Sequence, residues 1–363
     1  MSILSSLWDR IEDFLYPYME EKLDPLTEKQ HEFIAVCELA QLDKHMGRYR
    51  GSWLGRKKKA RIDFAKAFVS KAIYNFPTTE ILIEYLKDCK NLRRLCGWEH
   101  RCDVPSPATF SRAFKEFAEG GLGDVVLEVM VKDRYEDKIA GHISRDSTAI
   151  KAREKAAKKE AKHIRPKRKR GRKRKGEHHE PAPPTRLDLQ QGRSIKENLD
   201  DLPTACDWGT KTNSQGKKET WKGYKLHLDC VDGDIPISAI LTSASMHDSQ
   251  AAIPLTQMSA ERVTSLYDMM DSAYDAEQIK EFSQSVGHVP IIDPNPRRGD
   301  KREMEPAKKI RYNERSTSER VNSMLKDNYG GRHIRVRGTI KVNMHLMFGI
   351  IANCAVQLLR LLE

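Results

Sequence analysis

The sequence lacks the segments that would place a chain in a membrane or lead it into a secretory pathway. No run of 18 residues is free of polar side chains, and the most apolar stretch, 343–362, is interrupted by Asn, His, Gln and Arg. A helix that spans a bilayer needs about 20 predominantly apolar residues, so we expect a C-terminal helix over 340–363 that packs on the core. The first residues, MSILSSLWDRIEDF, have neither the cationic start nor the apolar centre of a signal peptide. We therefore expect a cytoplasmic protein with no membrane contact.

Cysteine is sparse and shows no metal-binding pattern. The seven cysteines are an odd number, widely spread, and none forms a CxxC pair. The tightest group, Cys89, Cys96, His100 and Cys102, does not have the spacing of the common zinc frameworks. Reduced thiols in the core of a cytoplasmic protein explain these cysteines better than a zinc site does.

Positive charge is in excess in only one segment. The formal net charge of the chain is +12, and residues 151–175 alone hold 15 Lys and Arg against two Glu. Such a block repels itself, which predicts a flexible insertion over 151–195, and it attracts a polyanion. A solvated linker or a nuclear-import signal is the alternative interpretation. The residues of this block that we expect to contact DNA are Lys167, Arg168, Lys169, Arg170, Arg172, Lys173 and Arg174.

Residues 1–125 carry apolar side chains at helical spacing and are expected to form an all-helical N-terminal domain. The stretch DVPSPATFSRAFKEFAEGGLG predicts a helix with Ser106 as N-cap, Pro107 at the first position and a glycine pair at the end. Together with the preceding helix it is a candidate helix-turn-helix, in which Arg112 and Lys115 would contact DNA. Ordinary helical bundles contain such pairs of helices too, so this domain could equally serve dimerisation.

Residues 139–350 alternate between strand and helix patterns, which predicts a mixed α/β sheet with helical partners. GYKLHLDCV alternates as a strand, an Asp-Gly turn follows, and PISAILTSAS is its hairpin partner. VTSLYDMMD and HVPIIDP are further strands, each next to a helical pattern. KIAGHIS is expected to be a short strand that ends near Asp146, and Asp248 is expected to cap the helix that follows it.

Three acidic residues occupy positions from which they could act together. Asp146 and Asp271 are each expected to end a strand, and Glu319 lies on a predicted helix. Each acid also has a purely structural interpretation. Asp146 could be a turn or cap residue, and Glu319 could complete a capping box with Ser316. Asp271 competes with Asp268, which would face the other side of a regular strand.

Three carboxylates at one edge of a sheet would repel one another unless cations lay between them. Mg²⁺ takes carboxylate oxygens and keeps positions for substrate phosphate oxygens. Two such ions activate a water or hydroxyl and stabilise the leaving oxygen of an in-line displacement. Cutting and joining DNA needs this chemistry, and the basic block would hold the DNA backbone.

The stretch YNERSTSERVNSMLKD, residues 312–327, places Tyr312, Arg315, Glu319 and Lys326 on one face if it is helical. An acid would then be flanked by two cations and a phenol. Solvated helices also carry mixed charges, so this spacing alone does not decide the function.

The same four residues, with all three gaps between them, resemble the Tyr-Arg-Glu-Lys signature of bacterial insertion-sequence transposases of the DDE type. RDSTAI resembles the first-aspartate segment of that family and MDSAYDA its second, which favours Asp271 over Asp268. WKGYKLHLDCVDGDIPISAILTSASMHDSQAA resembles its strand–turn–strand stretch. The resemblance covers about 139–350 and, more loosely, the helical front.

This resemblance implies an RNase H-like core, two Mg²⁺ or Mn²⁺ ions, cleavage at transposon ends and strand transfer into target DNA. The partners would be double-stranded DNA, as terminal inverted repeats and as target, and a second copy of the chain in the synaptic complex. The setting would be a prokaryotic cytoplasm, in association with the nucleoid. The implied catalytic metal ligands are Asp146, Asp271 and Glu319. The implied contacts with DNA phosphates are Tyr312, Arg315 and Lys326.

The chain departs from some members of that family, because Asp271 and Glu319 are only 48 positions apart. That leaves no room for the β domain that some relatives insert there. Functions of that domain, such as aiding a hairpin intermediate, are therefore not expected to carry over. The alternatives are a decayed relative or nuclease that binds DNA without moving it, and a non-catalytic basic DNA-binding protein.

Overall fold

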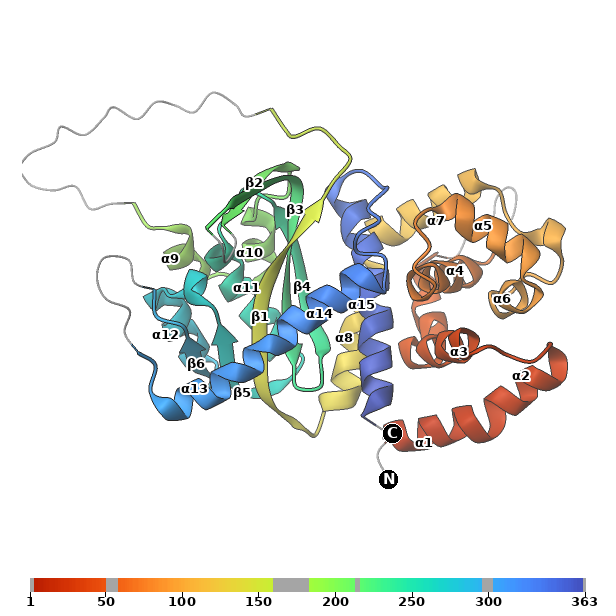
Figure 1. Cartoon of the computed structure of the whole chain (residues 1–363), viewed down its shortest axis with the longest axis horizontal. Coiled ribbons are helices and arrows are strands. Elements are labelled where there is room, and N and C mark those ends of the chain that lie inside the picture. Colours follow the sequence, from red (N-terminus) through yellow and green to blue (C-terminus); the bar gives the residue numbers. More distant parts are fainter. Residues whose placement is uncertain (1–2, 50–57, 159–182, 213–215, 296–302, 362–363) are drawn as a thin grey trace, which may run out of the picture.

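The structure is a computed structural model that describes residues 3–49, 58–158, 183–212, 216–295 and 303–361. A helical N-terminal region leads into a mixed sheet that is packed with helices (Figure 1). The predicted fold class, an all-helical N-terminal region beside a mixed-sheet core, is confirmed. The predicted DNA contacts between 167 and 174 lie outside the described residues.

The N-terminal region follows its sequence signals closely. Thr78 caps α5, because its side-chain oxygen accepts a hydrogen bond from the backbone N–H of Ile81 at 3.2 Å. Ser106 is the N-cap of α7, Pro107 is its first residue, and Gly120 follows its last residue, as predicted. The helices are α1 (Ile3–Arg10), α2 (Tyr16–Lys22), α3 (Glu28–Ala40), α4 (Arg61–Ile73), α5 (Thr79–Asp88), α6 (Lys90–Leu95), α7 (Pro107–Glu119) and α8 (Leu122–Tyr135).

The sheet has six strands in the order β2-β3-β1-β5-β6, and β4 pairs with β3. β3 is antiparallel to β1, β2 and β4, whereas β5 is parallel to both β1 and β6. The predicted hairpin forms between β3 and β4, where Gly233 and Asp234 have φ angles of +82° and +60°. The strands are β1 (Ile139–Lys151), β2 (Asp207–Thr212), β3 (Lys218–Val231), β4 (Ile235–Ser243), β5 (Thr264–Met270) and β6 (Val289–Ile292).

The alternation of side chains along β1 shows that helices cover both faces of the sheet. Ser144 bonds to Ser318 of α14, whereas the next residue, Arg145, pairs with Asp229, which accepts a hydrogen bond from Ser259 of α11. Successive residues of a strand point to opposite faces, so α14 and α11 lie on opposite faces. The helices of this region are α9 (Arg186–Gln190), α10 (Ile195–Asp201), α11 (Ala252–Ala260), α12 (Glu277–Ser285), α13 (Pro306–Tyr312), α14 (Ser316–Asp327) and α15 (Thr339–Arg360).

Helix α15 joins the two regions through one core. It lies between the sheet and the N-terminal helices (Figure 1), where it contacts α3, α4, α7, α8 and β4. One hydrophobic cluster includes Phe68 and Phe117 of the helical region, Phe348 of α15 and Leu241 of β4. By length and composition alone α15 could cross a membrane, but 89% of its most apolar window is buried inside the protein. Helix α15 is thus a buried part of this core.

Three local predictions near the candidate site are wrong. β1 continues to Lys151, so Asp146 lies in the middle of a strand and not at its end. Ser316 and Glu319 form no capping box, because the chain enters α14 from a 3-10 turn and the N-cap residue, Arg315, has a helical backbone (φ −56°, ψ −24°). Asp248 does not cap the turn it begins. The N-cap is His247, whose ring accepts a hydrogen bond from the backbone N–H of Ser249.

Candidate active site

Asp146 and Asp271 lie next to each other where β5 ends beside β1. β1 and β5 are parallel neighbours, and their register pairs Ser144 with Met269. Asp146 is two positions beyond Ser144, and Asp271 is two positions beyond Met269, directly after the end of β5. The predicted convergence of these two acids is therefore present in the strand pairing, although Asp146 is inside its strand.

The two carboxylates have unfavourable surroundings for their charges. Burial raises the pKa of Asp146 to about 6, and the neighbouring charge of Asp271 adds to that rise. The backbone N–H of Ser147 and the cations Arg315 and Lys211 act in the opposite direction. Burial also raises the pKa of Asp271, against a hydrogen bond of 2.9 Å from the backbone N–H that follows in the next turn. A pair of carboxylates in this state would be relieved by a bound cation.

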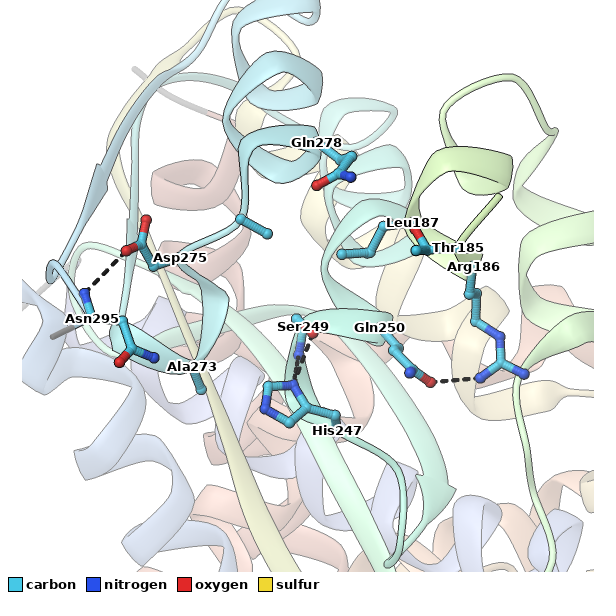
Figure 2. A pocket seen from close by; sticks show the side chains of 11 residues that line it. Thr185, Arg186, Leu187, His247, Ser249, Gln250, Ala273, Asp275, Gln278 and Asn295 are labelled. Carbon is cyan, nitrogen blue, oxygen red and sulfur yellow. Dashed lines mark hydrogen bonds between the residues drawn. The ribbon is translucent and has the colours of Figure 1, made fainter. Parts of the chain in front are cut away.

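A cavity of about 470 Å³ lies beside Asp271, because the residues of the turn that follows it form part of the wall (Figure 2). The turn after His247 and the start of α9 line the rest of the cavity, and His247 itself lines it. Many of its polar groups are bonded to one another: Arg186 donates to the side chain of Gln250 at 2.5 Å, and the His247 ring contacts the Ser249 hydroxyl at 2.8 Å. The cavity is therefore adjacent to the candidate site, although neither Asp146 nor Asp271 lines it.

Asp248 is a third acid near Asp146 and Asp271. The sequence had predicted that Asp248 caps a helix. Its carboxylate accepts a hydrogen bond from Lys225 of β3 at 2.8 Å. Burial opposes its charge, but His227 and Lys225 together hold the pKa of Asp248 below its ordinary value. Asp248 in turn raises the pKa of Asp271. The signal available in the sequence was its position between two predicted strands of one sheet.

Helix α14 lies along β1 in register with it. Ser144, Asp146 and Thr148 of β1 bond to Ser318, Asn322 and Lys326 of α14, respectively. Two strand residues advance by about 6.6 Å and four helix residues by about 6 Å, so the two rows match contact by contact. Asn322 donates to Asp146 at 3.1 Å. The sequence analysis did not single out Asn322, which lies in the same helical row as Lys326.

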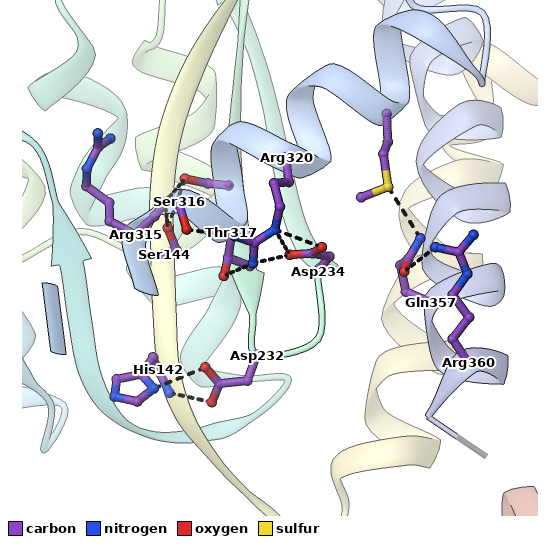
Figure 3. A network of polar contacts seen from close by, with 12 residues as sticks. His142, Ser144, Asp232, Asp234, Arg315, Ser316, Thr317, Arg320, Gln357 and Arg360 are labelled. Atoms are coloured by element: carbon purple, nitrogen blue, oxygen red, sulfur yellow. Dashed lines mark hydrogen bonds and ion pairs between the residues drawn. The ribbon is translucent and has the colours of Figure 1, made fainter. Parts of the chain in front are cut away.

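The rest of α14 is held by the hairpin turn and by its own first residues (Figure 3). Arg320 contacts Asp234 of the β3–β4 turn through two nitrogens: its Nε lies 2.9 and 3.0 Å from the two carboxylate oxygens, and its Nη2 lies 2.7 Å from Oδ1. The Ser144 hydroxyl donates to the backbone oxygen of Arg315 at 2.7 Å. These contacts fix the start of α14 over β1, and thereby place the signature residues beside the two aspartates.

Arg315 is the centre of the signature group. Its guanidinium lies 5.6 Å from the centre of the Tyr312 ring and pairs with Glu319 at 2.5 Å. Burial raises the pKa of Tyr312 to about 12, so the phenol is protonated at neutral pH. The side chain of Glu319 is 55% exposed, whereas that of Arg315 is 22% exposed. The charge of Arg315 also acts on Asp146 and Asp271.

Two lysines complete the positive border of the site. Lys326 donates to the hydroxyl of Thr148, and its pKa is lowered by burial and by the cations Arg332 and Lys211, against the charge of Asp146. Lys211 reaches the site from the edge strand β2 and lowers the pKa of Asp146 and Asp271. The sequence analysis did not single out Lys211, because only the sheet order brings β2 close.

The described residues bring the predicted acids together only in part. Within them, no group of three or more His, Cys, Asp or Glu side chains is placed to hold a metal ion. Asp146 and Asp271 are neighbours, whereas the carboxylate of Glu319 is turned toward Arg315. The three-carboxylate site therefore stays a prediction.

Two other charged residues of strands β1 and β5 are structural. Arg145, which could have been a phosphate contact, is 1% exposed and forms a bidentate ion pair with Asp229, with both contacts at 2.7 Å. Asp268 is equally buried and bonds to the His288 ring at 3.0 Å. The choice of Asp271 over Asp268 therefore agrees with their surroundings.

The predicted DNA contacts of the helical region lie on the exposed side of α7. Arg112 donates to the hydroxyl of Thr109 at 3.3 Å. Lys115 is 3.5 Å from Glu119, one turn further along the helix. Both side chains are exposed, and their role in binding DNA stays a prediction.

Two family models match the chain. Residues 139–354 match the family described as "Transposase DDE domain", and residues 19–116 match "Transposase domain (DUF772)". The first match covers the whole sheet, α14 and most of α15, and the second covers most of the helical region. Searches of curated proteins and of solved structures give no significant match.

Proposed function

The chain belongs to the transposase DDE domain family, and on that premise we propose that it is an insertion-sequence transposase of the Tyr-Arg-Glu-Lys signature group. It is a DNA transposase, and members of its family are polynucleotidyl transferases that generally depend on divalent metal ions. The observation that supports the site assignment best is that the β1–β5 register places Asp146 beside Asp271, and that Asp146 contacts α14, the helix that carries Glu319 and Lys326.

We assign the metal ligands to Asp146, Asp271 and Glu319. Two crowded aspartates with raised pKa values fit the donor set that Mg²⁺ or Mn²⁺ prefers. The chemistry that two such ions would supply is activation of a water or DNA 3′ hydroxyl and stabilisation of the leaving oxygen. The attacking oxygen forms a bond to phosphorus, and the bond from phosphorus to the DNA 3′ oxygen breaks, which leaves a 3′ hydroxyl. That hydroxyl then attacks a phosphodiester of the target: its oxygen bonds to the target phosphorus, and the bond from that phosphorus to the target 3′ oxygen breaks, which leaves a 3′ hydroxyl on the target strand.

Arg315 is proposed to exchange one partner for another during assembly of the site. In the structure its guanidinium pairs with Glu319. A DNA phosphate is a second anion that a guanidinium binds in bidentate fashion. Once Arg315 contacts the phosphate, Glu319 is released to join the two aspartates. Asn322 holds one oxygen of Asp146 in place throughout.

The remaining assignments concern DNA and assembly. We propose that Tyr312 and Lys326, like Arg315, contact phosphates near the transposon end, and that Arg112 and Lys115 of the N-terminal domain, residues 1–125, bind the terminal repeat. The basic block would add affinity for the backbone. Because both transposon ends are cut together, we propose a homodimer at synapsis. The enzyme would act on nucleoid DNA in the cytoplasm.

Cleavage of a supercoiled plasmid that carries the DNA flanking both sides of the gene tests this assignment. Separate Asp146→Asn and Glu319→Gln variants should each lower Mg²⁺-dependent cleavage by at least about 10³-fold, which corresponds to about 4 kcal/mol of transition-state stabilisation. DNA affinity, measured on the same plasmid ends by a mobility-shift assay, should change little.

Glu314→Gln is the matched control for this experiment. Glu314 is an exposed carboxylate on the turn just before α14 and has no part in the proposed site. It should cleave as the wild type does. If Glu319→Gln cleaves as well as Glu314→Gln, Glu319 is not a metal ligand. If the wild type and all variants bind DNA but do not cleave it, the alternative of a non-catalytic DNA-binding protein is favoured.

A further inference from the structure

A second cavity, of about 560 Å³, lies at the junction between the helical region and the catalytic region. One wall is formed by α4 and by the first turns of α5 and α7. The other wall is formed by residues 333–345, which span the end of the α14–α15 connection and the start of α15, with Arg153 just beyond β1. No part of the proposed catalytic machinery lines it. Both matched family regions therefore contribute to one hollow.

The cavity is strongly positive. Its lining includes Arg153, Arg335, Arg337 and Lys341, none of which has an ion-pair or hydrogen-bond partner within the described part of the chain. Two histidines and one further lysine also line it, and Glu80 is the only acid among the lining residues that the structure describes. Four unpaired cations around one hollow repel one another unless an anion lies between them.

Lys71 is a largely buried cation that lines the same cavity. This residue of α4 is 8% exposed, and within the described residues its ammonium group has neither a hydrogen bond nor an ion pair. Burial lowers the pKa of Lys71 to about 8, and the more distant charge of Glu80 only partly opposes that effect. Most of Lys71 is buried while its side chain lines the cavity, so an anionic oxygen in the cavity would give its ammonium group a partner in a position that water solvates poorly.

Backbone N–H groups at the start of α5 also favour an anion in the cavity. The cavity is lined by Thr79 and Glu80, the first two residues of the ten-residue helix α5. The N–H groups of a first turn have no acceptor inside the helix, and the N-terminus carries a partial positive charge. Only one of these groups is used locally, since Thr78 accepts from Ile81.

A positive path connects this cavity with the active site. Lys326, which bonds to β1 beside Asp146, is close enough to Arg332 for the charge of Arg332 to lower its pKa. Arg332 directly precedes His333, which lines the cavity. Arg332 also forms an ion pair with Asp327 at 2.6 Å, so the cations between the catalytic site and the junction are in part neutralised where Arg332 lies. A duplex backbone presents phosphates at regular intervals and suits such a path.

We propose that the junction cavity binds phosphodiester groups of the transposon-end duplex. The proposal rests on the proposed function, because it adds a contact for the DNA that the catalytic site cuts. A single backbone would touch both regions at once, which would place the end bound by the helices at the aspartates of the sheet. A free phosphate ion offers the same oxygens, so the test below separates the two sources.

A double Arg335→Gln, Arg337→Gln variant tests the proposal by its salt dependence. Both side chains are exposed, so the fold should tolerate the change. The slope of log affinity against log salt concentration should fall by about one for each lost phosphate contact, or about two in all. Because phosphates carry no sequence, binding should weaken by the same factor for a duplex of the DNA flanking the gene and for an unrelated duplex of equal length.

Lys132→Gln combined with Lys196→Gln is the matched control. It also removes two positive charges, from α8 and α10, and neither residue lines the cavity. An equal fall in the salt slope for both double variants would overturn the proposal, because overall charge would then explain the effect. The proposal also fails if the cavity variant binds DNA like the wild type while Asp146→Asn abolishes cleavage, an outcome that leaves the proposed function intact.

Lys71→Met provides a readout that a purely structural role would not give. Removal of a buried, unpaired charge should raise the melting temperature, and it should also lower DNA affinity at least twofold. Inorganic phosphate at constant ionic strength is the second arm. If phosphate raises the melting temperature of the wild type but not of Lys71→Met, and DNA affinity is unaffected by the substitution, the cavity binds a free ion and the DNA proposal is overturned.

Discussion

The two faces of strand β1 differ in whether a buried charge has an oppositely charged partner within the protein. On the face toward α11, Arg145 and Asp229 form a bidentate pair with side chains 1% and 0% exposed. On the face toward α14, the very next residue, Asp146, has another carboxylate as its neighbour, and burial raises its pKa. One peptide bond separates a charge whose partner is supplied by the fold from a charge whose partner must come from outside.

This difference shows which buried charges stabilise the fold and which serve its chemistry. The Arg145–Asp229 pair is complete, because Ser259 adds a third hydrogen bond, of 2.7 Å, to Asp229. Asp146 has two uncharged donors, the Asn322 amide and the backbone N–H of Ser147, and its cations Arg315 and Lys211 act on it only through their charge. Perturbed carboxylates of this kind gather at functional sites, and complete pairs do not need an added ion. The three predictions below test this contrast by removing charges from either face and from the surface.

The largest effect is expected for Asp229→Asn. The substitution leaves Arg145 charged and buried without its partner, and such losses cost about 3–5 kcal/mol. Chemical denaturation at pH 7 should show this fall in the free energy of unfolding. Asp232→Asn, which affects the half-exposed contact with His142, is the control and should cost less than about 1 kcal/mol. Equal losses would mean that burial of the pair is not what matters.

An intermediate effect of opposite sign is expected for Asp146→Asn. The pKa of Asp146 is raised in the folded state, from 3.8 to about 6, so its ionisation destabilises the fold. That cost is absent below about pH 4, grows between about pH 4 and pH 6, and is complete above about pH 6. At about 1.36 kcal/mol per pKa unit, the neutral variant should be more stable by up to about 3 kcal/mol at pH 8 and unchanged near pH 4.

Mg²⁺ should reduce the difference in the free energy of unfolding between Asp146→Asn and the wild type, because a cation bound between Asp146 and Asp271 stabilises the ionised wild type and not the variant. Denaturation at pH 8 with and without Mg²⁺ provides the comparison. A variant that is less stable than the wild type at pH 8 without metal would show that the carboxylate is structural, and the contrast between the two faces would then be lost.

The smallest effect is expected for Arg320→Gln, which removes the contact with Asp234 at the surface. The two side chains are 50% and 22% exposed, and exposed ion pairs contribute about 0–1 kcal/mol. The free energy of unfolding should fall by less than about 1 kcal/mol, and the loss should shrink further in 1 M salt. A loss as large as that of Asp229→Asn would contradict the idea that burial separates the two pairs.

Local signals in the sequence were sufficient for much of the fold. The β3–β4 hairpin follows from its alternation and Asp-Gly turn, and the start of α7 follows from Ser106 and Pro107. The length of β1 did not follow, because Asp146 and Ser147 are poor strand formers that are held in a strand by β3. The absent capping box has a similar cause, since α13 and the 3-10 turn lead straight into α14.

The candidate site was predictable where residues lie close in the sequence or match a known signature, and not elsewhere. The partner of Arg145 is 84 positions away, and Lys211 reaches the site only through the sheet order. The junction cavity combines α4, α5 and α7 with the segment before α15. Such combinations depend on tertiary packing, and no periodicity or spacing in one sequence reports them.

Helix α15 has a consequence for how the protein is made. Its buried surface fills the centre of both regions, yet it comes after both of them in the chain. A polypeptide still emerging from the ribosome can form its strands and helices but cannot close either interior until residue 360 has been translated. Nuclease capability would thus arise only after α15 has been made, and messages cut short before α15 would yield chains unable to damage the genome.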